Sequence, residues 1–196
     1  MDIDTFWQLI EDSLAHAPGR IARQAFLRDR LSVLPAAEII GFRAQLDRSE
    51  NRAYSWDLAG AATRIFGGWL SEDGFEYFRL WLIGRGRAAF EQAVAGPDSL
   101  AGLPEIGRLA GRRWTTWVAD TEWPEWESLA YVAIDAYARA TGDDDECAEA
   151  FYEALKARLS DDAFVGASRG DHWDARDETA ALVRIPDLAA MFPLDS

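Results

Sequence analysis

The chain has 196 residues, a length that suits one domain with a buried core and needs neither disulfides nor a structural metal. Its composition is 49% hydrophobic and 12% aromatic, with nine tryptophans, which excludes a disordered protein. A formal net charge of −14 disfavours binding to nucleic acid or to anionic membranes, because both carry dense negative charge.

The cysteine content and the first residues indicate the compartment. Cys147 is the single cysteine, so the chain cannot form an intramolecular disulfide or a thiolate metal cluster. The acidic start at residues 1–4 is not followed by the apolar segment of a secretory signal, and no apolar run is long enough to span a bilayer. We therefore expect a cytoplasmic protein without a bound cofactor or metal.

Helical spacing of apolar residues begins at the N-terminus. The first stripe predicts a helix with Asp2 or Asp4 as N-cap, ended by Pro18-Gly19. Its members are Ile3, Phe6, Trp7, Ile10 and Leu14. The same spacing predicts further helices at about 27–34, 35–46, 58–65, 71–82 and 90–94. Ser71 is the expected N-cap of the helix at 71–82, and Gly67-Gly68 marks a turn before it.

The second half of the chain is more varied. Asp98 is expected to cap a helix that reaches Pro104, and residues 105–120 predict an irregular connection with at most one short strand at 112–118. The clearest helical pattern runs from 124 to 141 and stops at Gly142. The acidic run 143–145 is expected to cap a helix through Leu155.

The tail at 160–196 is expected to dock on the body, with a last short helix at 179–183 and an apolar end. The sequence contains neither a set of strands with period-two alternation nor an internal repeat. These patterns together predict an all-α fold, a single irregular helical domain over 1–196.

Several stretches resemble a bacterial family, domain of unknown function 4240. They are Phe6-Trp7-x-Leu9-Ile10-Glu11, the central block at 54–101 and the stretch with Tyr131-Val132-Ala133 and Ala136-Tyr137. Within the block the motifs are Tyr54-x-Trp56-Asp57-Leu58, Gly67-Gly68, Asp73-Gly74-Phe75-x-x-Phe78-Arg79-x-Trp81-Leu82-Ile83, Gly86-Arg87 and Pro97-Asp98-Ser99-Leu100-Ala101. Glu72 and Arg85 depart from the expected pattern. The resemblance implies no activity, because the family has no assigned chemistry.

The central block supplies most of the candidate ligand-binding residues, because charged side chains stand there among large aromatics. Arg79 and Arg87 would hold a carboxylate or phosphate between aromatic walls. The alternative is structural: Asp73 caps a helix, Arg79 pairs with Asp57 or Glu76, and the rings belong to the core. The candidates are Trp7, Trp56, Asp57, Asp73, Arg79, Trp81 and Arg87.

Other motifs give weaker signals. The run Gly84-Arg85-Gly86-Arg87 lacks the strand and the Lys-Ser/Thr ending of a phosphate loop, so a helix-terminating turn is the better interpretation. Asp171-His172-x-Asp174 has one histidine between carboxylates, which could serve as a weak metal site or a general base. Cys147 follows acidic residues that raise a thiol pKa, so we interpret it as inert.

Three functions fit these observations. The leading hypothesis is a non-enzymatic module that binds a protein partner or a small anionic ligand, because no catalytic signature stands out. The second is an enzyme acting on a small anionic substrate around Asp57, Asp73, Arg79 and Trp81. The third is an immunity or antitoxin-like protein whose acidic surface binds a basic partner.

Overall fold

A computed structural model of the protein describes residues 1–142, 148–159 and 169–194. In this part of the chain the backbone forms α-helices and short 3-10 helices (η) and no strand, which confirms the predicted all-α class. The elements are α1 (Ile3–His16), α2 (Gly19–Leu31), α3 (Ala36–Ala53), α4 (Trp56–Ile65), α5 (Glu72–Gly84), α6 (Arg87–Ala95), η1 (Pro97–Gly102), α7 (Pro104–Gly107), η2 (Trp114–Thr116), α8 (Ala119–Glu122), η3 (Glu127–Tyr131), α9 (Val132–Thr141), α10 (Glu149–Arg158), α11 (Glu178–Arg184) and α12 (Pro186–Met191).

Local sequence explains where several helices begin and end. The Asp2 side chain accepts a hydrogen bond from the Thr5 N–H at 2.8 Å, so it caps α1 as predicted. Ser71 caps α5 in the same way, accepting from the Gly74 N–H at 3.0 Å. Gly142 ends α9 in a left-handed conformation with φ of 73°, a region that glycine adopts without steric cost.

The middle of the chain forms the predicted irregular connection, and one helix there begins later than predicted. The segment 112–118 forms no strand; its centre is the 3-10 helix η2, since the described residues provide no neighbouring strand to pair with it. The helix expected from 124 begins later, as η3 followed by α9, since the Trp126 N–H donates to the Tyr77 carbonyl at 2.9 Å instead of joining a helix. The predicted cap at 143–145 lies outside the described residues.

Asp98 lies in the 3-10 helix η1 and does not cap a helix of its own segment. Its carboxylate accepts hydrogen bonds from the N–H groups of Asp187 and Leu188, at 3.1 and 2.9 Å. It therefore caps the start of α12, far along the chain. Sequence spacing alone cannot reveal such a long-range cap.

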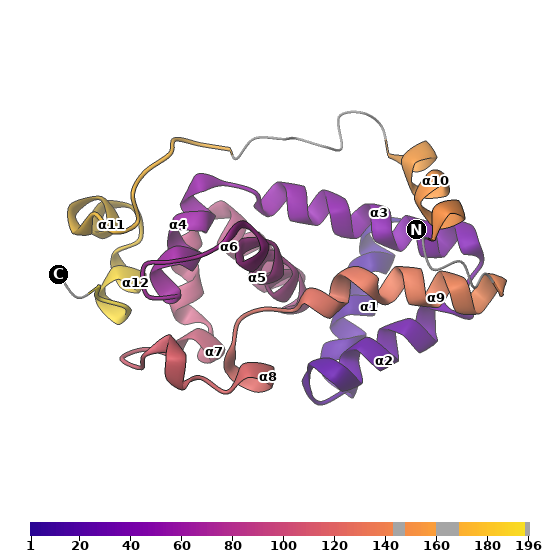
Figure 1. The fold of residues 1–196 in the computed structure, drawn as a ribbon, viewed down its shortest axis with the longest axis horizontal. Coiled ribbons are helices and arrows are strands. Elements are labelled where there is room, and N and C mark those ends of the chain that lie inside the picture. Colours follow the sequence, from indigo (N-terminus) through magenta and orange to yellow (C-terminus); the bar gives the residue numbers. More distant parts are fainter. Residues whose placement is uncertain (143–147, 160–168, 195–196) are drawn as a thin grey trace.

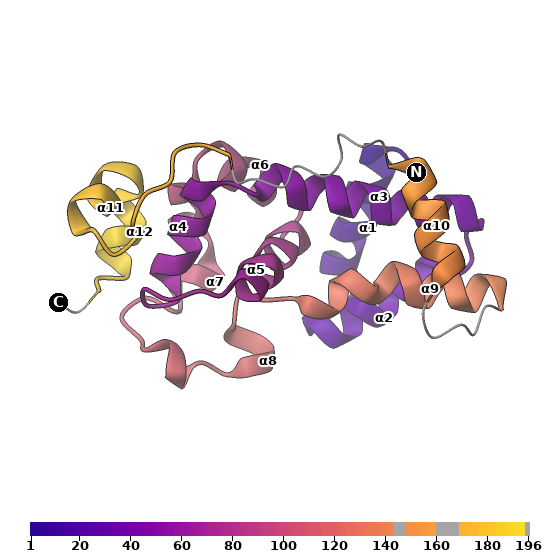
Figure 2. The same cartoon turned by 45° about the horizontal axis from the view of Figure 1, so that its top comes forward.

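Three groups of helices follow one another along the long axis of the molecule. In Figures 1 and 2, α1, α2, α3, α9 and α10 gather at one end, α11 and α12 lie at the other, and α4 to α7 stand between them. One cluster of buried hydrophobic side chains extends from Met1 to Phe192. Its aromatic members interlock: the Phe6 ring centroid lies 5.0 Å from Trp7 and 5.1 Å from Phe42.

The C-terminal segment 169–194 packs against α4. The Trp173 ring lies against Gly60, where a Cβ atom would stand 2.2 Å from its Cζ2. Arg64 is fully buried and donates to the Ala175 carbonyl at 3.1 Å and to the Glu178 carboxylate. Within the described residues no helix combines the length and apolar character that crossing a membrane requires.

Candidate functional site

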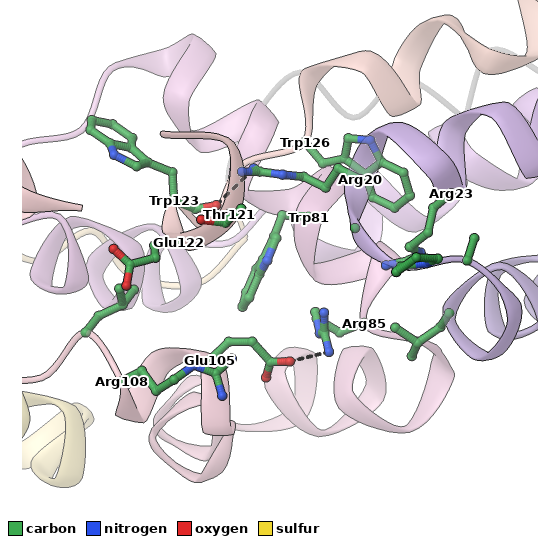
Figure 3. A pocket seen from close by; sticks show the side chains of 15 residues that line it. Arg20, Arg23, Trp81, Arg85, Glu105, Arg108, Thr121, Glu122, Trp123 and Trp126 are labelled. Carbon is green, nitrogen blue, oxygen red and sulfur yellow. Dashed lines mark hydrogen bonds and ion pairs between the residues drawn. The ribbon is translucent and has the colours of Figure 1, made fainter. Parts of the chain in front are cut away.

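A cavity of about 320 Å³ opens where the α1–α2 corner meets the C-terminal end of α5, α7 and α8 (Figure 3). Its walls combine four guanidinium groups with three indole rings and two carboxylates. The charged and aromatic lining residues are Arg20, Arg23, Arg85, Arg108, Trp81, Trp123, Trp126, Glu105 and Glu122. Basic groups thus outnumber acidic ones here, although the chain as a whole is strongly acidic.

The first turns of α2 bring two of these arginines to the cavity. Pro18 and Gly19 form the corner after α1, and Gly19 has a φ of 76° that other residues rarely adopt. Arg20 follows at once and donates to the carbonyls of Trp123 at 3.0 Å and of Glu125. These bonds tie the start of α2 to the segment that carries two of the tryptophans.

Arg23 is the most unusual group of the site. Its side chain is buried, with 5% of the residue exposed, and it donates to Ser13 Oγ at 3.1 Å and to the Gly84 carbonyl at 2.7 Å. Both acceptors are neutral. Among the described residues no carboxylate lies within ion-pair distance of Arg23, and its Nη1 has no hydrogen-bond acceptor. A buried cation without an anionic partner is costly, so its retention calls for a reason.

The ring of Trp126 covers this guanidinium, with Arg23 Cζ 4.5 Å from the ring centroid. Gly84 permits this close packing, because a Cβ atom there would lie 2.5 Å from Cε3 of Trp126. The Trp126 Nε1–H donates to Ser128 Oγ at 3.2 Å. The indole is therefore fixed in place beside the cation.

Arg85 stands near Arg23 at the end of α5. It forms an ion pair with Glu105, which leaves each partner partly exposed. Burial and the charge of Arg85 together lower the pKa of Arg23 to about 10. The two guanidinium groups therefore repel each other in the folded protein. Gly86, with a φ of 89°, ends the helix as a turn, in agreement with the sequence interpretation of 84–87.

The opposite side of the cavity carries Glu122. Arg112 binds this carboxylate with two hydrogen bonds, at 2.6 and 2.9 Å, and the Val118 N–H donates to it at 2.8 Å. These bonds lower the pKa of Glu122 to about 2. Glu122 is therefore a fixed negative charge that is already neutralised by Arg112.

Two of the tryptophans predicted as ligand-binding residues are buried. Trp7 is 2% exposed, and its ring packs between Phe6 and Phe90 at centroid distances of 5.0 and 5.1 Å. Trp81 is 7% exposed, contacts Phe78 at 5.4 Å and also lines the cavity. Trp81 is thus the predicted residue that the structure places in the arginine-rich cavity.

The predicted charged residues bind separate partners. Asp57 pairs with Arg184 at 2.6 Å, and Arg87 pairs with Asp4 at 2.7 Å. Asp73 is exposed in the first turn of α5. The structure therefore does not bring these side chains together as one charged group.

Arg79 contacts α3 rather than Asp57. Its Nη1 donates to the Glu50 carbonyl at 3.1 Å, and its guanidinium lies over the Tyr54 ring, 4.7 Å from the centroid. The Glu50 side chain is buried nearby, and burial raises its pKa to about 7 although Arg79 and Arg43 oppose the shift. These contacts join α3 to α5 inside the molecule.

Trp56 and His172 meet on another face, with ring centroids 4.4 Å apart at 88°. They line a shallow hollow of about 450 Å³ together with Trp173 and Arg176. The described residues contain no group of three or more side chains placed to hold a metal ion. Cys147 lies outside the described residues.

Sequence reasoning missed most of the cavity, including Arg20, Arg23, Arg108, Trp123 and Trp126. One signal for Arg23 was present. It stands four residues before Leu27, which stands four before Leu31, and all three are buried. A charged residue on the apolar stripe of a helix is therefore the pattern that indicates this site.

The comparisons with known proteins give a family and no further relative. No curated protein and no solved structure matches the chain. The model of a family described as "Protein of unknown function (DUF4240)" matches residues 1–139, which include α1 to α8, η3 and most of α9. The matched range holds every lining residue of the cavity. The chain belongs to this family, DUF4240, as the motifs in its sequence indicate.

Proposed function

We propose that the protein binds a small anionic ligand in the cavity between α2, α5, α7 and α8. The observation that carries the proposal is Arg23, a buried guanidinium with neutral acceptors, no carboxylate partner in the described part of the chain and a second guanidinium, that of Arg85, close by. An anion between the two would supply the missing negative charge.

The chemistry of the groups supports a carboxylate or a phosphate. Guanidinium groups present planar pairs of N–H donors that match the spacing of oxygens in these anions. Arg23 is positioned before any ligand arrives, by Ser13, Gly84 and Trp126. Binding therefore requires little reordering of this side chain, which favours affinity.

The site also explains how an acidic protein can bind an anion. The net charge of −14 repels anions at long range, but salt screens that repulsion beyond about 8–10 Å. Inside the cavity the nearest groups determine binding, and the buried guanidinium of Arg23 has no carboxylate partner among the described residues. Selection by shape and contact, rather than attraction by overall charge, is the expected mode of binding.

The other functions remain predictions. No contact among the described residues specifically favours an enzyme centred on Asp57, Asp73 and Arg79. The same is true of an immunity protein that binds a basic partner. Binding of a ligand without catalysis requires no groups other than those that line the cavity described above.

A thermal-shift screen tests the proposal directly. Carboxylate and phosphate metabolites, with inorganic phosphate included, are mixed with the protein at constant ionic strength. A ligand that binds the folded state raises the melting temperature, by an amount that grows with the logarithm of its concentration divided by its Kd. We expect at least one anion to raise it, and neutral analogues of the same compounds to leave it unchanged.

Two variants locate the binding. Arg23→Met removes the buried charge, and the double variant Arg85→Gln/Glu105→Gln removes an ion pair without changing the net charge. Arg139→Gln, at an exposed pair with Asp29 outside the cavity, is the matched control. The proposal predicts that the first two lose the shift and the control keeps it. Equal shifts in all variants would place the site elsewhere and overturn the proposal.

A further inference from the structure

The cavity places three tryptophan rings around the same space as its arginines. In Figure 3 the Trp81 ring stands in the middle, with Arg23 and Arg85 on one side and Trp123 and Glu122 on the other. A molecule that reaches Arg23 and Arg85 therefore lies alongside an indole. Leu14 and Leu109 add apolar surface to the lining.

The indoles are held by contacts outside the cavity. Trp123 packs against Phe66 and Trp117 at centroid distances of 5.8 and 6.0 Å, and its Nε1–H donates to the Trp117 carbonyl at 3.4 Å. Trp81 is supported by Phe78, as described above. Rings that are already ordered lose little freedom when a ligand stacks on them, so they favour a flat partner over a flexible one.

Resting on the anion site proposed above, we infer that the ligand is a small aromatic anion, a planar ring that carries a phosphate or a carboxylate. The anionic group binds between Arg23 and Arg85, and the ring stacks on Trp81. The volume of about 320 Å³ matches the lower end of the range for small-molecule sites, which suits one ring system with a short acidic arm.

Matched pairs of ligands test the ring and the acid separately. Isothermal titration calorimetry compares phenyl phosphate with methyl phosphate, and benzoate with acetate, at constant ionic strength. The inference predicts at least tenfold tighter binding for the aromatic member of the tighter-binding pair. The comparison between phenyl phosphate and benzoate then identifies the preferred acidic group.

A tryptophan variant tests the stacking partner. Trp81→Leu is expected to reduce the affinity for the aromatic ligand at least tenfold while leaving its non-aromatic match unchanged. Trp69→Leu is the control, since Trp69 is 67% exposed and lies outside this cavity. If Trp81→Leu does not fold, proton NMR of the aromatic ligand with the wild-type protein replaces it, and stacking on an indole is expected to move the ring protons upfield.

The outcomes separate the two proposals. Equal affinity within both pairs, or ring protons that do not shift, would overturn the inference that the ligand is aromatic. The proposal of an anion site would then remain. An aromatic preference that survives Trp81→Leu would overturn the stacking. If none of the four compounds binds and the anion screen is also negative, both proposals fall.

Discussion

The indole of Trp173 fills the space that a side chain on Gly60 would need, because a Cβ atom at that position would lie 2.2 Å from Cζ2 of the ring. Gly60→Ala should therefore destabilise the protein by about 1–3 kcal/mol, even though alanine favours the helix. Chemical denaturation of a double-mutant cycle measures the effect. In the Trp173→Ala background the Gly60→Ala change should be neutral or stabilising, and additive effects would argue against this packing.

Asp98 is expected to stabilise α12 from a distance. Asp98→Ala removes the acceptor for the Asp187 and Leu188 N–H groups and should lower the free energy of unfolding by about 1 kcal/mol. Asp98→Asn retains an acceptor oxygen and should recover part of the loss. Urea denaturation followed by circular dichroism compares the three proteins; an equal loss in both variants would contradict capping.

The two buried arginines should respond differently to replacement by methionine. Arg64 donates to Ala175 and Glu178, so Arg64→Met should cost about 2–3 kcal/mol. Arg23 has no carboxylate partner in the described part of the chain, and the lowering of its pKa from 12.5 to about 10 corresponds to roughly 3 kcal/mol of destabilisation of the charged form.

The free-energy cost of burying this charge offsets the stabilisation that Arg23 gains from its hydrogen bonds and from its contact with the Trp126 ring. Arg23→Met should consequently change the stability of the ligand-free protein by less than about 1 kcal/mol, as is typical where a residue is kept for binding. Denaturation midpoints of both variants give the comparison. A large loss in Arg23→Met would assign that residue a structural role instead.

Glu50 gives the stability a specific dependence on pH. Burial raises its pKa from 4.5 to about 7, so the folded state retains a proton that the unfolded state releases between these values. The contribution of Glu50 is therefore fully favourable below pH 4.5 and falls by about 3 kcal/mol as the pH rises to 7.

Glu50→Gln removes this titration but keeps a side chain of similar shape. The variant should gain stability relative to the wild type between pH 5 and pH 7.5, with Arg43, Arg79, Asp47 and Glu76 unchanged around it. Urea denaturation at both pH values measures the difference. A constant difference would show that Glu50 titrates alike in both states.

The fold class and the starts of α1 and α5 were predictable because their signals are local. Asp2 and Ser71 cap the helix that directly follows each of them, and the spacing of apolar residues gives the buried face. The segment 112–118 forms the predicted irregular connection without a strand, because tryptophan and threonine favour strands only when a partner strand exists. The late start of the helix near 127 depends on a long-range bond from Trp126 to Tyr77.

The candidate site was less predictable because it is assembled from the ends of separate helices. Arg23 lies on α2 and Arg85 is the C-cap of α5, and no sequence spacing indicates that they approach each other. Charged residues that the sequence places in the same central block, such as Asp57 and Arg79, bind different partners instead. Trp81 is common to the predicted and the observed site, because it belongs to the central block and lines the cavity.

The segment that covers α4 lies beyond residue 139, where the match to the family ends. Arg64 and Gly60 are inside the matched range, yet Ala175, Glu178 and Trp173 complete their surroundings. A fragment that stops at the family boundary would expose a guanidinium and an apolar helix face to water. The packing around Arg64 and Gly60 therefore depends on residues outside the range that the family model matches.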